Sequence, residues 1–180
     1  MILDTRETMK YSILPFVLII FTSCCSKKTL IAEPMSYHLE SNCPEDGTCT
    51  ITVYPNQKLE VLTDETGSIY YKKVSATNSS VFHFQYNKTV EEGIQDGHYQ
   101  EELLFEYSNE NLPLQLADQS LQTSKMLFGR HCFCKGQAGY FLVNSGNLNL
   151  DQTKGKTTIN FQFKVTEVPQ IITEIQGNWK

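Results

Sequence analysis

The stretch Thr158-Ile159-Asn160-Phe161-Gln162-Phe163-Lys164-Val165 alternates strictly between polar and apolar side chains. Successive side chains of a β-strand point to opposite faces, so this pattern predicts a strand with one face in a core and the other in water. The same alternation occurs at 49–53, 81–86 and 102–107. In the 81–86 strand Phe82, Phe84 and Tyr86 are expected to face the core, which places His83 on the solvent side.

Shorter candidate strands lie at 58–62, 68–74, 125–134, 139–144 and 171–175. Glycine-containing turns separate them, including Asp64-Glu65-Thr66-Gly67 and the segment 135–139. Only 116–121 has the composition of a short helix. Strands recurring about every 10–15 residues, with no long helical pattern, predict an all-β domain from residue 35 to 180. We expect an antiparallel β-sandwich or a small barrel-like domain, with the aromatic side chains mainly in its core and an aromatic binding platform as the alternative.

The amino-terminal segment has a different composition. Residues 13–21 form a nine-residue apolar run that follows Lys10. This arrangement is typical of a secretory signal peptide, because a transmembrane helix needs about 20 apolar residues. We therefore predict a signal peptide over 1–23, and a start at Met9 would make residues 1–8 an upstream extension.

The sequence Phe21-Thr22-Ser23-Cys24 resembles the lipobox of bacterial lipoproteins, although that family prefers leucine where this chain has Phe21. The resemblance implies cleavage before Cys24 and attachment of lipid (diacylglycerol, with palmitate-like acyl chains) to its sulfur and new amino terminus. Residues 24–34 would then be a lipid-anchored tether. The family's inner-membrane retention signal, an aspartate just after the lipid cysteine, is absent, which favours the outer membrane with the domain facing the periplasm.

The overall charge narrows the range of partners. The formal net charge is −5, and the chain has neither the basic face of a nucleic-acid binder nor a long polybasic run for anionic lipid. We expect no nucleic-acid partner and no cofactor beyond the covalent lipid. The membrane is expected to be contacted through the lipid anchor.

Four cysteines remain after Cys24 and Cys25: Cys43, Cys49, Cys132 and Cys134. Exported proteins form disulfides, and four cysteines allow three connectivities. Cys132 and Cys134 would point to the same side of one strand, where a direct bridge closes a very tight ring. We therefore favour two bridges that join Cys43 and Cys49 to Cys132 and Cys134. Each would close a loop of about 80–90 residues and contribute about 4–5 kcal/mol.

Two alternatives use the same residues. Cys43, Cys49, Cys132 and Cys134, with His131 beside them, could hold zinc or copper, although their spacings differ from the usual separation of about two to four residues between paired ligands. The segment 131–134 could also act as a redox centre, since Arg130 and Lys135 would lower the pKa of a nearby thiol. The acidic loop 91–96 is a weaker calcium candidate.

The leading functional hypothesis is a non-enzymatic cell-envelope lipoprotein whose β domain is structural or binds another envelope protein, a peptide or a glycan. The alternative is a thiol-redox or metal-binding protein that uses the Cys132–Cys134 segment. No catalytic residue can be assigned, because none of the motifs tested has the spacing that its chemistry requires.

Overall fold

A computed structural model of the chain describes residues 32–39 and 42–180. The signal peptide predicted at 1–23, Cys24 and residues 25–31 of the tether lie outside the described residues. No helix in the described residues is long and apolar enough to span a membrane.

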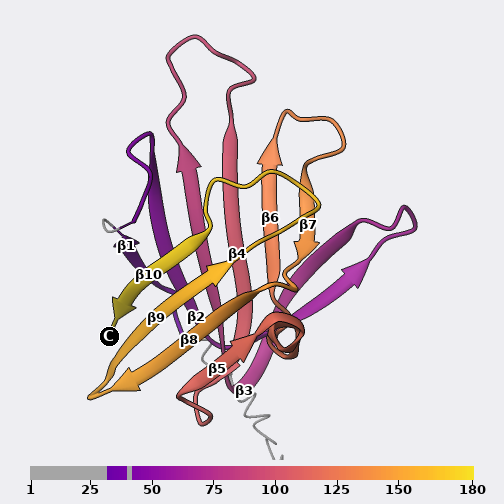
Figure 1. Cartoon of the computed structure of the whole chain (residues 1–180). Helices are drawn as coiled ribbons and strands as arrows, with labels where there is room; N and C mark the ends of the chain where they lie inside the picture. The colour runs from indigo at the N-terminus through magenta and orange to yellow at the C-terminus, as the bar shows by residue number, and fades with distance from the viewer. Residues whose placement is uncertain (1–31, 40–41) are drawn as a thin grey trace, which may run out of the picture. The chain divides into compact units, whose positions relative to one another are not determined.

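The described residues form strands and one short helix (Figure 1). In chain order these are β1 (Met35–Leu39), β2 (Gly47–Thr63), β3 (Ile69–Lys88), β4 (Tyr99–Ser108), β5 (Leu114–Ala117), the 3-10 helix η1 (Asp118–Ser124), β6 (Leu127–Cys132), β7 (Gly139–Leu142), β8 (Gly146–Thr153), β9 (Lys156–Phe163) and β10 (Glu174–Trp179).

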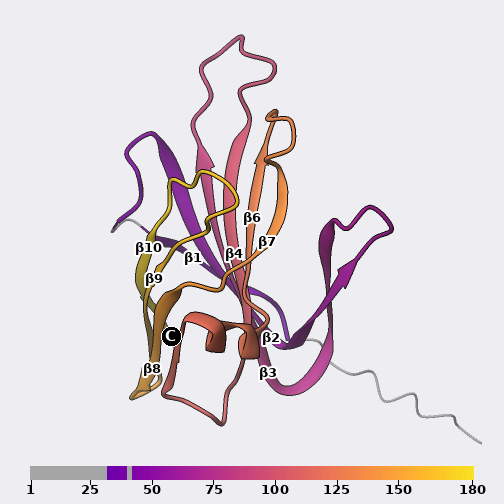
Figure 2. The same cartoon turned by 45° about the vertical axis from the view of Figure 1, so that its right-hand side comes forward.

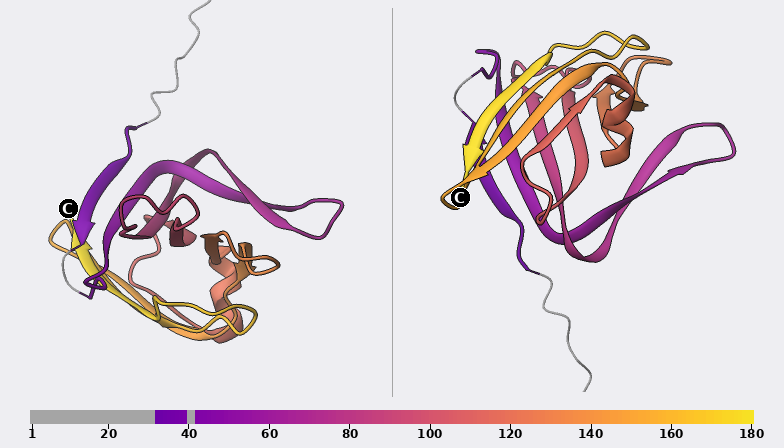
Figure 3. Two further views of the ribbon diagram at one scale, coloured as in Figure 1. Left: turned by 90° about the horizontal axis from the view of Figure 1, so that it is seen from above. Right: turned by 60° about the horizontal axis from the view of Figure 1, so that its bottom comes forward.

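The strands build two antiparallel sheets. A six-stranded sheet has the order β1-β2-β3-β4-β6-β7, and a four-stranded sheet has the order β10-β9-β8-β5. The two sheets lie face to face over a common core, as the view from above shows (Figure 3). The predicted all-β sandwich is therefore confirmed.

The core between the sheets comes from the predicted alternation. Ile159, Phe161 and Phe163 are buried, and the polar residues between them are exposed. The rings of Phe128 and Phe163 approach to 6.0 Å across the sheets, and those of Phe82 and Trp179 to 5.5 Å. Aromatic rings at such separations pack favourably in a core.

A second, smaller core lies on the other face of the six-stranded sheet. The hairpin formed by β2 and β3 bends at a bulge between Pro55 and Gln57 and leaves the plane of the other strands (Figure 2). Its distal part covers the sheet's outer face and buries Leu59 against Val81 and Leu104. Ile69 near the hairpin tip pairs with Tyr140 of β7, so that β3, β4, β6 and β7 close a ring of strands.

This covering hairpin overturns one expectation. His83 was placed on the solvent side of its strand, but its exposed fraction is only 5%. The direction of the side chain is as predicted, away from the sandwich core. The prediction of solvent contact is wrong because the folded hairpin covers that face.

Several element boundaries also differ from the sequence-based expectation. The segments 49–53 and 58–62 belong to one strand, β2, the segments 68–74 and 81–86 belong to β3, and β8 was not predicted. The segment 116–121 begins as strand β5 and continues as η1. The last strand occupies Glu174–Trp179 and not 171–175, because the backbone N–H groups of Ile171 and Ile172 donate to the carboxylate of Glu101 (2.6 and 2.7 Å).

Candidate functional site

The outward face of the four-stranded sheet is lined with carboxamide side chains, and we call it the carboxamide face. It comprises Gln115 of β5, Asn147 and Asn149 of β8, Asn160 and Gln162 of β9, and Gln176 and Asn178 of β10. The register aligns Gln115, Asn149, Asn160 and Gln176 in one row across the sheet. Neighbouring strands in such a row are about 4.8 Å apart.

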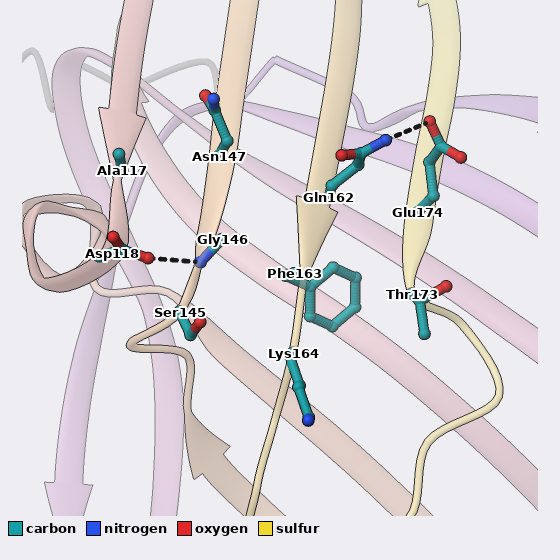
Figure 4. A pocket seen from close by; sticks show the side chains of 10 residues that line it. All are labelled: Ala117, Asp118, Ser145, Gly146, Asn147, Gln162, Phe163, Lys164, Thr173 and Glu174. Atoms are coloured by element: carbon teal, nitrogen blue, oxygen red, sulfur yellow. Dashed lines mark hydrogen bonds between the residues drawn. The ribbon is translucent and has the colours of Figure 1, made fainter.

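Two open hollows lie on this face and share Asn147 and Gln162. One is lined only by carboxamides. The other extends from Asp118 at the start of η1 to Glu174 of β10, and Phe163 and Lys164 also line it (Figure 4). At one end of this hollow, the carboxylate of Asp118 accepts a hydrogen bond from the N–H of Gly146 at 3.1 Å.

Some side chains of the carboxamide face are held in place by hydrogen bonds within the protein, and others have their hydrogen-bonding groups available for a ligand. Gln162 and Gln176 both donate to one carboxylate oxygen of Glu174, at 3.2 and 2.5 Å. Within the described part of the chain, the side chains of Asn147, Asn149 and Asn160 make no hydrogen bond to protein. Each carboxamide offers two N–H donors and a carbonyl acceptor. Among the described residues, the outward positions of these four strands hold no aromatic ring, and the one aromatic side chain that lines either hollow is the mostly buried Phe163.

A second polar cluster is buried under the β2–β3 hairpin, centred on Glu102 of β4. One carboxylate oxygen accepts from His83 Nε2 at 2.5 Å. The other accepts from His131 Nε2 at 2.6 Å and from the hydroxyl of Tyr140 at 2.5 Å. Gly129 of β6 leaves room for these contacts, because a Cβ there would lie 2.6 Å from Glu102 Cγ and 2.8 Å from the Tyr140 ring.

These hydrogen bonds determine the charge of the cluster. Burial by itself raises the pKa of Glu102, but the hydrogen bonds from His131, His83 and Tyr140 outweigh it and hold the pKa well below its ordinary value. Burial, together with the hydrogen bond to Glu102, raises the pKa of the Tyr140 hydroxyl. Glu102 is therefore a carboxylate, and Tyr140 a neutral donor, at any pH near neutrality.

The same region attaches the hairpin to the sheet. The N–H of Leu59 donates to Glu106 at 2.7 Å, and the ammonium of Lys125 donates to the Leu59 carbonyl at 2.6 Å. Lys125 also pairs with Glu106 at 3.0 Å. The backbone N–H and carbonyl of Leu59 are thus hydrogen-bonded to side chains. This part of β2 is at the edge of the sheet, where backbone groups otherwise remain unpaired.

The structure corrects the predicted cysteine pairing. Cys43 bonds Cys49, and Cys132 bonds Cys134. Cys49 and Cys132 belong to β2 and β6, which are separated by β3 and β4, so about 14 Å lies between them measured along the sheet. The four cysteines therefore do not converge on a metal, and each cysteine is bonded to its neighbour in the sequence and not across the sheet.

The local pairs have geometric reasons. The Cα atoms of Cys132 and Cys134 are 5.2 Å apart, within the ordinary range for a disulfide. β6 ends at Cys132, so Cys134 lies outside the strand and its side chain need not follow the strand's alternating directions. Short loops of this kind contribute about 2 kcal/mol each in the chain-entropy model, roughly half of what the long loops would contribute.

No metal centre is formed by the described residues: none of them gather three or more His, Cys, Asp or Glu side chains in a metal-binding arrangement. His131 belongs to the Glu102 cluster. In comparisons with protein-family models, curated proteins and solved structures, nothing matches this chain.

Proposed function

We propose that this chain is a lipid-anchored binding protein of the bacterial cell envelope, and that its β domain binds a neutral glycan through the carboxamide face. The observation that supports the glycan is the row of uncharged donor–acceptor side chains across four strands. Sugar hydroxyls both donate and accept hydrogen bonds, and a carboxamide matches both roles. The lipobox resemblance at Cys24 supports the anchor and the compartment.

The anchor gives the first prediction. Replacing Cys24 by alanine is expected to release the chain from the membrane fraction of a bacterial host, because stable anchoring requires the acyl chains. The measurement is membrane fractionation together with metabolic labelling by an alkyne fatty acid. In the matched control Cys25→Ala, labelling and membrane association should be unchanged. Labelling that survives Cys24→Ala would contradict the proposal.

The carboxamide face gives the second prediction. The double substitution Asn160→Ala and Gln162→Ala removes neighbouring hydrogen-bonding groups from both hollows. Each lost hydrogen bond is worth about 0.5–1.5 kcal/mol, so we expect affinity to fall about tenfold. Binding should be measured by calorimetry against a panel of neutral oligosaccharides and peptidoglycan fragments.

The control is Gln119→Ala, which removes an exposed carboxamide of η1 outside the carboxamide face. It should bind like the unsubstituted chain. If no saccharide binds, or if the double variant binds as tightly as Gln119→Ala and the unsubstituted chain, the glycan proposal is wrong.

A further inference from the structure

The bond between Cys132 and Cys134 lies where the chain leaves β6 for the β6–β7 loop. Phe133 between the two cysteines is 85% exposed, the highest value among the large exposed apolar side chains of the described residues. Both cysteines are partly exposed, whereas Cys49 of the other bridge is fully buried. A partner molecule can therefore approach either cysteine of the Cys132–Cys134 bridge, whereas in the other bridge only Cys43 is partly exposed.

A charged group is placed against one of these sulfurs. Arg130 is almost fully buried, and its Nη1 lies 3.0 Å from Cys134 Sγ. The guanidinium is held by the carbonyl and side-chain oxygens of Gln137 at 3.1 and 3.2 Å, and by the Tyr99 hydroxyl at 3.3 Å. A fixed positive charge stabilises a thiolate and makes it a better leaving group.

The bridge is also poorly suited to a structural role. It spans a sequence separation of only 2 and joins no two strands, so it constrains little of the unfolded chain. The exposed Phe133 contributes nothing to either core. Exposed disulfides with a stabilised thiolate are the labile and catalytic ones.

We propose that Cys132 and Cys134 form a redox-active disulfide that oxidises dithiols of other envelope proteins, with Arg130 as a positioning residue for the Cys134 thiolate. This activity is independent of the carboxamide face and of the glycan proposal. Phe133 would contact an apolar segment of the incoming, incompletely folded protein.

The exchange balances in two steps. A thiolate of the partner attacks Cys132 Sγ, the bond between the two sulfurs breaks, and Cys134 leaves as a thiolate beside Arg130. The partner's second thiolate then attacks the partner's first sulfur, which is bonded to Cys132 in the mixed disulfide. This step releases Cys132, which takes a proton from water. The partner loses two electrons and gains a disulfide, and Cys132 and Cys134 become a dithiol. A more oxidising disulfide of another protein reverses the exchange and restores the bridge.

The test uses the purified full-length mature chain in glutathione buffers of graded ratio, followed by thiol alkylation and peptide mass spectrometry. Cys43–Cys49 in the same molecule is the internal control. We expect the Cys132–Cys134 bridge to open at glutathione ratios at which Cys43–Cys49 stays closed. Equal resistance of the two bridges would overturn the proposal.

A second measurement follows the rate at which the chain oxidises a fluorescent dithiol peptide. We expect Arg130→Gln to slow this reaction about tenfold and to raise the pKa of the Cys134 thiol in a Cys132→Ser background. The Cys132→Ser chain shows by its unfolding curve whether the domain remains folded. Oxidation no faster than by oxidised glutathione, or a Cys134 pKa that is the same with and without Arg130, would refute the assignment.

Discussion

Replacement of Glu102 by alanine is expected to lower the free energy of unfolding by about 3–5 kcal/mol, because it removes the shared acceptor of three donors, of which His83 is buried and the other two are partly buried. His83, His131 and Tyr140 all direct their hydrogen bonds to this carboxylate. Chemical denaturation can be followed by the fluorescence of Trp179, the only tryptophan of the chain, which is buried in the core.

The matched control is Glu60→Ala, which removes an exposed glutamate from the same hairpin. It should change stability by no more than about 0.5 kcal/mol. A comparably small loss for Glu102→Ala would mean that the cluster does not hold the hairpin to the sheet.

The contribution of Glu102 should also depend on pH. Its pKa in the folded chain lies below the ordinary value of 4.5, so the unfolded chain binds more protons in the acid range. The stabilisation is therefore complete at pH values above the ordinary pKa and is lost progressively as the pH falls below it. In acid, the difference in unfolding free energy between the unsubstituted chain and Glu102→Ala should shrink.

The second large effect is expected at Phe161. Its ring is fully buried and stacks on Phe163 with 4.9 Å between centroids. Truncation to alanine should cost about 3–5 kcal/mol through lost burial and the cavity that remains. The measurement is the same fluorescence-detected denaturation.

Asn160→Ala is the control for this prediction, because the neighbouring side chain of the same strand faces water. It should leave stability unchanged within about 0.5 kcal/mol while weakening the proposed glycan binding. Equal destabilisation by the two substitutions would mean that β9 is not half-buried as described.

The alternation of polar and apolar residues was enough to predict the fold class. It predicted the candidate sites only in part. The alternation at 158–165 correctly predicted which side chains of β9 enter the core and that Asn160 and Gln162 face outward. It contained no information on the strands beside β9. The continuous row of carboxamides exists because β5, β8, β9 and β10 are neighbours in one sheet.

The errors share one physical cause. The direction of a side chain depends on the extended backbone of its own strand, so the sequence by itself determined the all-β class, the core-facing side chains of β9 and the outward direction of His83. Whether an outward face meets water, and whether two cysteines can meet, depends on contacts between residues far apart in the chain. Only the tertiary structure decided that the β2–β3 hairpin covers His83 and Glu102, and that β3 and β4 separate Cys49 from Cys132.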